Sequence, residues 1–366
     1  MHDGAHVWRT PTTTGTTGTT TGTARTARPA PTRDAAARTP HAGSPTRRTV
    51  LLAGLAGLVV PLVGCTPGSP DAAATATATP SPTGAPTASS AQGAPAIDTA
   101  GVQAALAALE TESGLTLGVA AIDTGTGAVV GHRADERVLL CSTAKVLVVA
   151  AALALRAERP ALLGEPVPIP AGQVVDHSPV TAEHEGGELP VAVLCDAAIT
   201  QSDNTAANAL MTLVGGPAGV TAYVRTLGDE LTRLDRLEPE LNQGAPGDER
   251  DTSTPAQVAA DLRLLAVEEG LPPESRDPLV GWMRGSTTGE DRIRAGVPEG
   301  WTVGDKTGTG PNGEVHDVGV LWPPAGAPVV LAVYTSPAVA GTGSVEASSA
   351  VVARVAALVT EAFTTA

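Results

Sequence analysis

Apolar and polar positions divide the chain into a head without periodicity and a body with regular elements. Residues 1–46 are rich in Thr, Ala, Pro and Arg and show no apolar period, which predicts disorder. From Ile97 onward the apolar positions become regular. Helical spacing predicts helices over the stretches 102–109, 142–156, 254–270 and 345–363.

Strand patterns flank these helices. Runs of apolar and β-branched residues predict strands over 115–123, 128–132, 314–322 and 328–335. Two more helices are expected within 190–227 around a Gly-Gly-Pro turn, and Thr254 is expected to cap the helix that starts at Pro255. Because strands lie at both ends and helices between them, we expect an α/β (α+β) fold. It would comprise an antiparallel sheet flanked by helices and a mostly helical subdomain.

The head has the features of an export signal. Arg47 and Arg48 precede fifteen uncharged residues, 50–64, which are too few to span a bilayer but suit a signal peptide. An arginine pair there resembles a twin-arginine signal, and Leu-Val-Gly-Cys65 resembles the lipobox of bacterial lipoproteins. An ordinary cleaved signal with an accidental cysteine is the alternative.

We therefore expect three segments along the chain. They are a signal peptide with a long leading region over 1–64, a lipidated Cys65 with a disordered Ala/Thr/Pro/Ser linker over 65–96, and a catalytic domain over 97–366. The protein would be exported and lipid-anchored to the outer face of the cell membrane, with release from the cell left open.

Charge supports this division and argues against nucleic acid as a partner. The 366 residues carry a net charge of −15. Residues 1–64 hold seven Arg against two Asp, which gives +5, and the rest hold 16 basic and 36 acidic residues, which gives −20. A basic leader before an acidic body favours a soluble domain and disfavours a nucleic-acid binder.

Cysteine and histidine spacing favours no metal centre. Cys65, Cys141 and Cys195 are too few for a disulfide framework, and the seven histidines form no ligand motif. We expect neither a metal nor another cofactor. Of 23 basic residues only two are lysines, Lys145 and Lys306. Because an ammonium can be tuned into a base and a guanidinium cannot, these two positions are candidates for chemistry.

Four polar motifs interrupt the apolar pattern, and each has a purely structural alternative. Ser142-Thr-Ala-Lys145 would place a hydroxyl and an amine on one helical face, or would be a capping serine beside a surface lysine. Ser202-Asp203-Asn204 follows an apolar helix and also suits a helix-ending turn. The other two motifs are a charged loop, Arg236–Asn242 with 248–252, in which Arg236 would pair with Asp251, and a strand leading into Lys306-Thr-Gly-Thr-Gly310.

In this order the four motifs resemble those of class A serine β-lactamases, and the similarity covers roughly residues 97–366. The loop reading Glu238-Pro-Glu-Leu-Asn242 is specific to that class. The resemblance is to the actinobacterial, lipoprotein-anchored form. It implies a monomer that hydrolyses the amide of small-molecule β-lactams.

The resemblance also implies a role for each motif residue. Ser142 would be the nucleophile, Lys145 a base or proton relay, Ser202 a proton donor to the leaving nitrogen, and Glu238 the base that activates water. Substrate contacts would come from Asn204, Asn242, Lys306, Thr307, Gly308, Thr309 and Arg292. The backbone N–H groups of Ser142 and Thr309 would form the oxyanion hole.

Some positions depart from the family pattern. Leu237 and His177 replace aromatic residues that many members carry. Some relatives bridge the position of Cys141 to that of Gly310, and the family's usual partner for Cys195 lies at Val149, so we expect no disulfide in the domain.

Three other functions are alternatives to β-lactam hydrolysis. A penicillin-binding D,D-peptidase shares three motifs but lacks the deacylating glutamate, so Glu238 argues against it. A non-catalytic lipoprotein would have lost one of the reactive residues. An α/β-hydrolase esterase would need a G-x-S-x-G motif around its serine.

Overall fold

A five-stranded antiparallel sheet organises the part of the chain that the computed structural model describes, residues 97–364. Its strand order is β2-β1-β9-β8-β7. The strands are β1 (Leu115–Asp123), β2 (Val129–His132), β7 (Thr302–Thr309), β8 (Val315–Trp322) and β9 (Val329–Pro337). The four predicted strands and the antiparallel sheet are confirmed. The strand expected before the Lys-Thr-Gly motif is β7, and it includes the motif rather than ending ahead of it.

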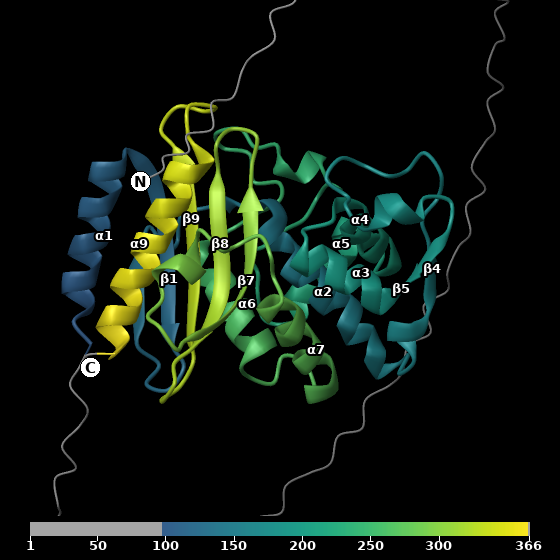
Figure 1. Cartoon of the computed structure of the whole chain (residues 1–366), viewed down its shortest axis with the longest axis horizontal. Helices are drawn as coiled ribbons and strands as arrows, with labels where there is room; N and C mark the ends of the chain where they lie inside the picture. Colours follow the sequence, from purple (N-terminus) through teal and green to yellow (C-terminus); the bar gives the residue numbers. More distant parts are fainter. Residues whose placement is uncertain (1–96, 365–366) are drawn as a thin grey trace, which may run out of the picture. The chain divides into compact units, whose positions relative to one another are not determined.

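Both faces of the sheet are buried, so its central strands are apolar at almost every position. Along β9, Leu331 and Val333 contact one core while Val330 and Ala332 contact the other. Helices α1 (Thr99–Ser113) and α9 (Val345–Thr364) cover the first face, as Figure 1 shows, and α6 (Pro255–Ala266) packs on the second. Among the described helices α9 alone is long and apolar enough to cross a membrane, yet its Val352, Val355 and Val359 are buried in the first core.

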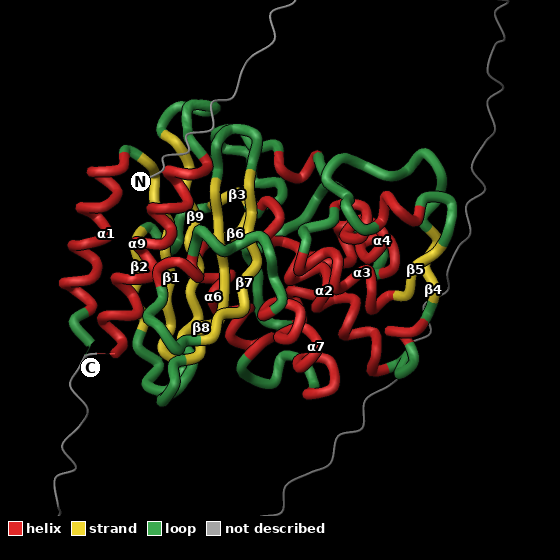
Figure 2. Tube along the Cα trace, viewed as in Figure 1, coloured by secondary structure: helices red, strands yellow, loops and turns green. Residues whose placement is uncertain are grey.

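A mostly helical subdomain lies beside the second face of the sheet (Figure 2). Its helices are α2 (Lys145–Ala154), α3 (Val191–Thr200), α4 (Asn204–Leu213), α5 (Pro217–Thr226) and α7 (Pro273–Arg284). Two small ribbons pair β3 (Val138–Leu139) with β6 (Thr252–Ser253) and β4 (Pro166–Pro168) with β5 (Glu188–Pro190). A four-residue helix, α8 (Ile293–Gly296), precedes β7. Short 3-10 turns cover Cys141–Ala144, Leu155–Ala157, Leu162–Gly164, Thr181–His184 and Glu240–Asn242.

Three helix predictions need correction. The stretch 190–227 holds three helices, because Ser202 has a left-handed φ of 58° and Asp203 caps α4 by accepting from Ala206 N at 2.8 Å. The stretch 142–156 begins and ends as 3-10 turns around α2. Helix α7 was not predicted, since prolines and charged residues interrupt its apolar spacing.

The cap at Thr254 is confirmed, since its hydroxyl accepts from Gln257 N at 3.2 Å. The predicted signal peptide, Cys65 and linker lie outside the described residues.

Candidate active site

The nucleophile candidate Ser142 lies in the tight turn Cys141–Ala144, between β3 and α2. Cys141 takes a left-handed φ of 47°, and Thr143 N–H donates to Leu140 O at 3.2 Å, a 3-10 contact. The expectation that Ser142 opens a continuous α-helix is therefore wrong. Side chains three apart still align in a 3-10 turn, so Ser142 and Lys145 remain neighbours. The Thr143 hydroxyl also bonds Tyr334 Oη at 2.9 Å, which ties the turn to β9.

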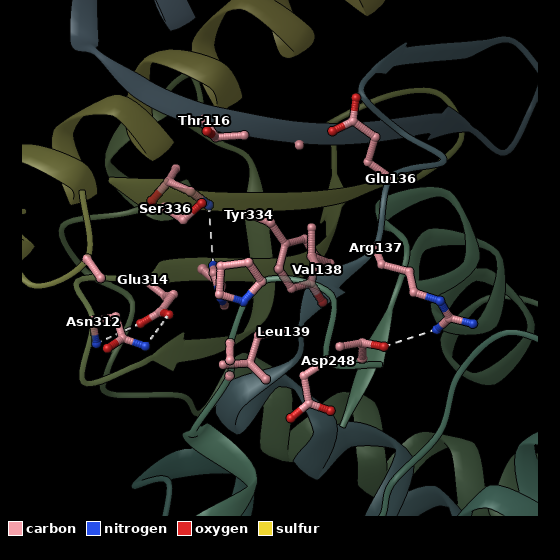
Figure 3. Close-up of a pocket in the computed structure, with 18 of the residues that line it drawn as sticks. Thr116, Glu136, Arg137, Val138, Leu139, Asp248, Asn312, Glu314, Tyr334 and Ser336 are labelled. Atoms are coloured by element: carbon pink, nitrogen blue, oxygen red, sulfur yellow. Dashed lines mark hydrogen bonds between the residues drawn. The ribbon is translucent and has the colours of Figure 1, made fainter. Parts of the chain in front are cut away.

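A cavity of about 490 Å³ lies next to this turn but contains none of the expected site residues. Its wall includes Val138 and Leu139 just ahead of the nucleophile turn, and Tyr334 of β9. Figure 3 shows Glu314 paired with Asn312 on one side of this space and Arg137 on the other. The charged side chains of the wall pair with protein groups, and the candidate catalytic residues lie outside this cavity.

Lys145, the first residue of α2, is the centre of the polar cluster. Its Nζ lies 2.9 Å from Ser142 Oγ and 3.0 Å from Glu238 Oε1. The same nitrogen donates to Asn204 Oδ1 at 2.6 Å and contacts Ser202 O and Oγ at 2.8 and 3.2 Å. Burial lowers the pKa of Lys145, and the carboxylate of Glu238 opposes that shift. The ammonium thus joins three of the four motifs in one hydrogen-bonded group.

Glu238 places a carboxylate beside the nucleophile. Its Oε1 accepts from Ser142 Oγ at 3.5 Å, and its Oε2 accepts from Asn242 Nδ2 at 2.5 Å. The backbone of Glu238 is held by Asn208, whose amide exchanges two hydrogen bonds of 2.8 Å with its N–H and C=O. Sequence reasoning missed Asn208. Its position four residues after Asn204, on the same face of α4, was the signal that could have found it.

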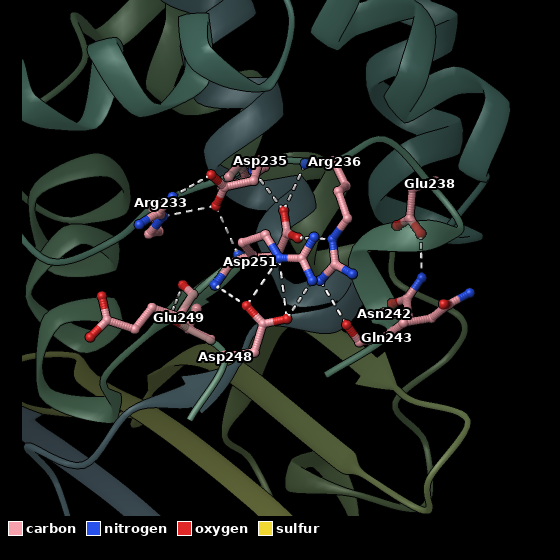
Figure 4. A network of polar contacts seen from close by, with 12 residues as sticks. Arg233, Asp235, Arg236, Glu238, Asn242, Gln243, Asp248, Glu249 and Asp251 are labelled. Atoms are coloured by element: carbon pink, nitrogen blue, oxygen red, sulfur yellow. Dashed lines mark hydrogen bonds and ion pairs between the residues drawn. The ribbon is translucent and has the colours of Figure 1, made fainter. Parts of the chain in front are cut away.

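The loop 235–252 that carries Glu238 is closed by an internal ion pair, shown in Figure 4. Arg236 Nε donates to Asp251 Oδ2 at 2.5 Å, which confirms the predicted pairing. Asp251 Oδ1 also accepts from the backbone N–H groups of Asp235 and Arg236, at 2.7 and 3.0 Å. Arg236 reaches Gln243 O at 2.7 Å. One buried carboxylate therefore joins both ends of the loop.

The Ser202–Asn204 motif is built from a strained turn and a helix start. The left-handed Ser202 turns its side chain toward Lys145, and Asp203 accepts from Val180 N and Thr181 N, both at 2.9 Å. Asn204 is nearly buried, with Oδ1 on Lys145 and Nδ2 donating to Asp176 O at 2.8 Å. In this arrangement Asn204 holds the lysine and an adjoining loop.

The edge strand β7 faces the nucleophile turn. A Cβ on Gly308 would lie 3.1 Å from Thr143 Cγ2 and 3.2 Å from Leu140 O, so glycine permits this approach. Lys306, fully buried, donates from Nζ to Thr307 O at 2.9 Å. Burial, with the charge of Lys145 nearby, lowers the pKa of Lys306 to about 7.

Arg292 supports the end of this strand from behind. Its guanidinium donates to Gly308 O at 2.8 Å, to His316 O at 2.6 Å and to Thr309 Oγ1 at 2.8 Å. A second hydroxyl contact, Thr288 Oγ1 to Thr307 Oγ1 at 2.6 Å, was not foreseen, because Thr288 lies in a loop without a recognisable motif. All four motifs thus meet between β7 and the helical subdomain.

A nucleophile, a buried amine, a loop carboxylate and a cationic edge strand form this arrangement, and comparisons agree with it. Residues 101–363 match the model of the β-lactamase enzyme family. The AST-1 β-lactamase of Nocardia asteroides is 52% identical over 233 residues, 63% of this chain and 74% of the relative. The chain belongs to the class A β-lactamase family.

Other class A relatives share the fold and much of the sequence. The CTX-M-8 β-lactamase of Citrobacter amalonaticus is 46% identical over 233 residues, 64% of this chain and 80% of the relative. The solved ancestral (GNCA) class A β-lactamase aligns with a TM-score of 0.69 and 50% identity, covering 72% of this chain and all of that one. The Mycobacterium abscessus class A enzyme aligns with a TM-score of 0.69 and 44% identity, covering 72% and 99%.

The described cysteines of this family member are both free and buried. Cys141 lies against Gly310, where an added Cβ would lie 3.1 Å from its sulfur, and Cys195 is buried within α3. Burial raises the pKa of both thiols. Over residues 97–364, no three His, Cys, Asp or Glu side chains gather as a metal-binding set.

Proposed function

We propose that this class A family member hydrolyses the amide bond of β-lactam antibiotics through a Ser142 acyl-enzyme and thereby confers resistance to them. The observation that carries this proposal is the Glu238 carboxylate, 3.5 Å from Ser142 Oγ and 3.0 Å from Lys145 Nζ. Forming the acyl-enzyme requires a nucleophile and a base, and hydrolysing it requires a second base beside water. Glu238 meets that second need.

Acylation would begin with removal of the Ser142 proton by Lys145 or by Glu238 through a water. The freed oxygen attacks the lactam carbonyl carbon, and the carbonyl oxygen becomes an oxyanion bound by the N–H groups of Ser142 and Thr309. The C–N bond then breaks, and the nitrogen takes a proton from Ser202. Ser202 Oγ lies 3.2 Å from Lys145, which would return the proton.

Substrate binding would use the cationic edge of the sheet. Lys306, Thr307 and Thr309 would bind the substrate carboxylate along β7, supported by Arg292 behind Thr309. Gly308 would let β7 lie close to the nucleophile turn, so that the bound lactam and Ser142 are near each other. Asn204 would contact the substrate amide through the second hydrogen of Nδ2, since its Oδ1 accepts from Lys145 and its other N–H donates to Asp176 O.

Deacylation would use the loop carboxylate. Glu238, oriented by Asn242 at 2.5 Å, removes a proton from water, whose oxygen attacks the ester carbon of the acyl-enzyme. The Ser142–acyl bond breaks, and Ser142 Oγ takes the proton that Glu238 removed from water, which restores the free enzyme. The Nocardia asteroides and Citrobacter amalonaticus relatives are named as β-lactamases, which favours hydrolysis over a D,D-peptidase reaction.

A hydrolysis time course with a chromogenic cephalosporin in large excess tests this proposal. Wild type should turn over continuously, Ser142→Ala should be inactive, and Glu238→Ala should stall as an acyl-enzyme that mass spectrometry detects. A single burst equal to the enzyme concentration in wild type would instead mean a penicillin-binding protein.

For the cell, we propose export through the twin-arginine signal and anchoring through lipid on Cys65, as in the actinobacterial lipoprotein form. The Arg47-Arg48 pair, the uncharged run 50–64 and the Cys65 motif support this. Membrane fractionation should place wild type with the membrane and Cys65→Ser in the soluble fraction. An unchanged distribution would contradict the lipid anchor. We also propose a monomer, which light scattering of the soluble variant would test.

A further inference from the structure

The position of Arg292 depends on a helical segment that is too short to be stable on its own. Arg292 directly precedes α8, a helix of four residues. A single helical turn is unstable in isolation, because the free energy needed to nucleate it exceeds the free energy gained from its few hydrogen bonds. The close approach of Gly296 to α9, where an added Cβ would lie 1.9 Å from Ala353 O, limits the room on that side. The Ile293 side chain is buried in the first core, and polar contacts with the sheet hold the backbone of the segment that carries Arg292.

Two buried carboxyl groups of the sheet contact this segment. Asp317 Oδ2, on β8, accepts from the backbone N–H of Ile293 at 3.1 Å. Asp305 Oδ1, on β7, accepts from Arg294 Nε at 2.6 Å. Because Asp317 pairs across the strands with Thr307, two residues beyond Asp305, the two carboxyl groups lie on one face of the sheet.

The carboxyl groups hold the two residues that directly follow Arg292 in the chain, and the sheet holds the side chain of Arg292 itself. Residues 293 and 294 are held by carboxyl groups, while the Arg292 guanidinium is held by Gly308 O and His316 O. Its remaining contact, to Thr309 Oγ1, is the one that faces the proposed substrate position. Moving residue 293 would therefore displace the guanidinium from Thr309.

We propose that Asp317, assisted by Asp305, is a positioning residue for the substrate-carboxylate site, acting on substrate only through Arg292. This inference rests on the proposed function. Both side chains are fully buried, and their shortest hydrogen bonds go to Ile293 N and Arg294 Nε rather than to a residue assigned to the substrate. Their effect should therefore appear in substrate binding and not in the acyl-transfer steps.

The surroundings of Asp317 indicate which substitution preserves this role. Its Oδ1 has no hydrogen-bond partner, and burial, together with the charge of Asp305, raises the pKa of Asp317 well above its ordinary value. A neutral carboxyl group would be replaced closely by an asparagine, whose oxygen can accept from Ile293 N. Alanine would remove the acceptor entirely.

A double-mutant cycle on the full-length enzyme tests the proposal. Asp317→Ala, Arg292→Ala and the double variant are compared on a penicillin and on its methyl ester, with Asp317→Asn as matched control. We expect Asp317→Ala to raise KM for the acid about tenfold, within the range of coupling between residues in one network. It should leave kcat and the ester's kinetics nearly unchanged, and have no further effect in the Arg292→Ala background. Asp317→Asn should restore the wild-type KM.

Additive losses in the double variant, equal losses on acid and ester, or a fall confined to kcat would each overturn the proposal. If Asp317→Ala does not fold by thermal melting, Asp305→Ala, which removes the acceptor of Arg294, takes its place in the same cycle, with the same expected and overturning results. Failure of the proposed function would look different, because wild type would then show no turnover on either substrate.

Discussion

The only two lysines of this chain are both buried, yet their surroundings are opposite. Lys145 on α2 contacts five oxygen atoms, one of them the carboxylate of Glu238. Lys306 on β7 donates to a single backbone oxygen, that of Thr307, and the charge of Lys145 lowers its pKa further. Lys145 has a carboxylate within salt-bridge distance, whereas among the described residues Lys306 has only the longer-range charges of Asp305 and Asp317.

The difference shows what each region of the site is prepared for. A buried cation without an anionic partner is costly, and a bound anion relieves that cost. Lys306 is therefore suited to an anionic group of the substrate. Lys145 already has its anion and can exchange protons with Ser142 and Ser202, both within 3.2 Å. The helical subdomain supplies the proton chemistry and the sheet edge supplies the anion site.

The largest expected effect comes from replacing Lys145 by arginine, and the same replacement at Lys306 is its comparison. Lys145→Arg should lower kcat/KM by about 10²–10⁴, because a guanidinium does not serve as a base and its longer fork does not fit among five fixed oxygens. Lys306→Arg keeps the positive charge and should lose far less. Steady-state kinetics on both variants, with thermal melting as the folding control, make the measurement. Equal losses would remove the distinction between the two regions.

Removing the charge at the sheet edge is expected to act on binding. Lys306→Ala should raise KM for a carboxylate substrate roughly 10- to 100-fold, the usual range for a lost hydrogen bond to a charged group. The methyl ester of the same substrate, which offers no anion, is the control and should respond little. A loss of the same size on the ester would assign Lys306 to the acyl-transfer chemistry instead.

The pH dependence should separate the two lysines further. Since the pKa of Lys306 is about 7, the free enzyme loses this cation as pH rises through 7, and kcat/KM for a carboxylate substrate should fall there. A bound anion favours the charged ammonium, so kcat should fall less than kcat/KM. Lys306→Arg, which stays charged, should remove the decline. A wild-type profile that stays level through pH 9 would contradict this assignment.

The smallest expected effect on activity comes from joining the two regions covalently. In Gly310→Cys the new Cβ would lie 3.1 Å from Cys141 Sγ, close to the separation of about 3 Å that disulfide bond geometry requires. Glu314, whose Oε2 would meet that Cβ, has to turn away. We expect a disulfide in the oxidised protein, a Tm higher by several degrees and largely retained turnover. Reductant, or Cys141→Ala in the same variant, should abolish the gain in Tm.

Much of the fold followed from local pattern because both faces of the sheet are buried. The apolar run 328–335 between turns predicted a strand, and the helical spacing of 345–363 predicted α9. The pattern failed where tertiary contacts overrode it. Ser202 ends a helix through a left-handed backbone, and α7 forms despite an internal proline because it packs on β7.

The site was predictable to a lesser degree. The motifs identified Ser142, Lys145 and Glu238, and the structure brings them within 3.5 Å of one another. Asn208 and Thr288 carry no motif, and their contacts depend on elements distant in sequence. The sequence also could not show that Asn204 accepts a hydrogen bond from Lys145, because the same amide is equally able to contact a ligand.

The sequence by itself determined which reactive groups this protein has, their order along the chain and the strands and helices that carry them. Only the tertiary structure decided how each group is charged and held. Lys145 and Lys306 are the same residue type and both are buried, although Asp305 directly precedes Lys306. Their difference arises from Glu238, which reaches one lysine and not the other. Distances between residues about a hundred positions apart are set by packing, and electrostatic energy depends on those distances.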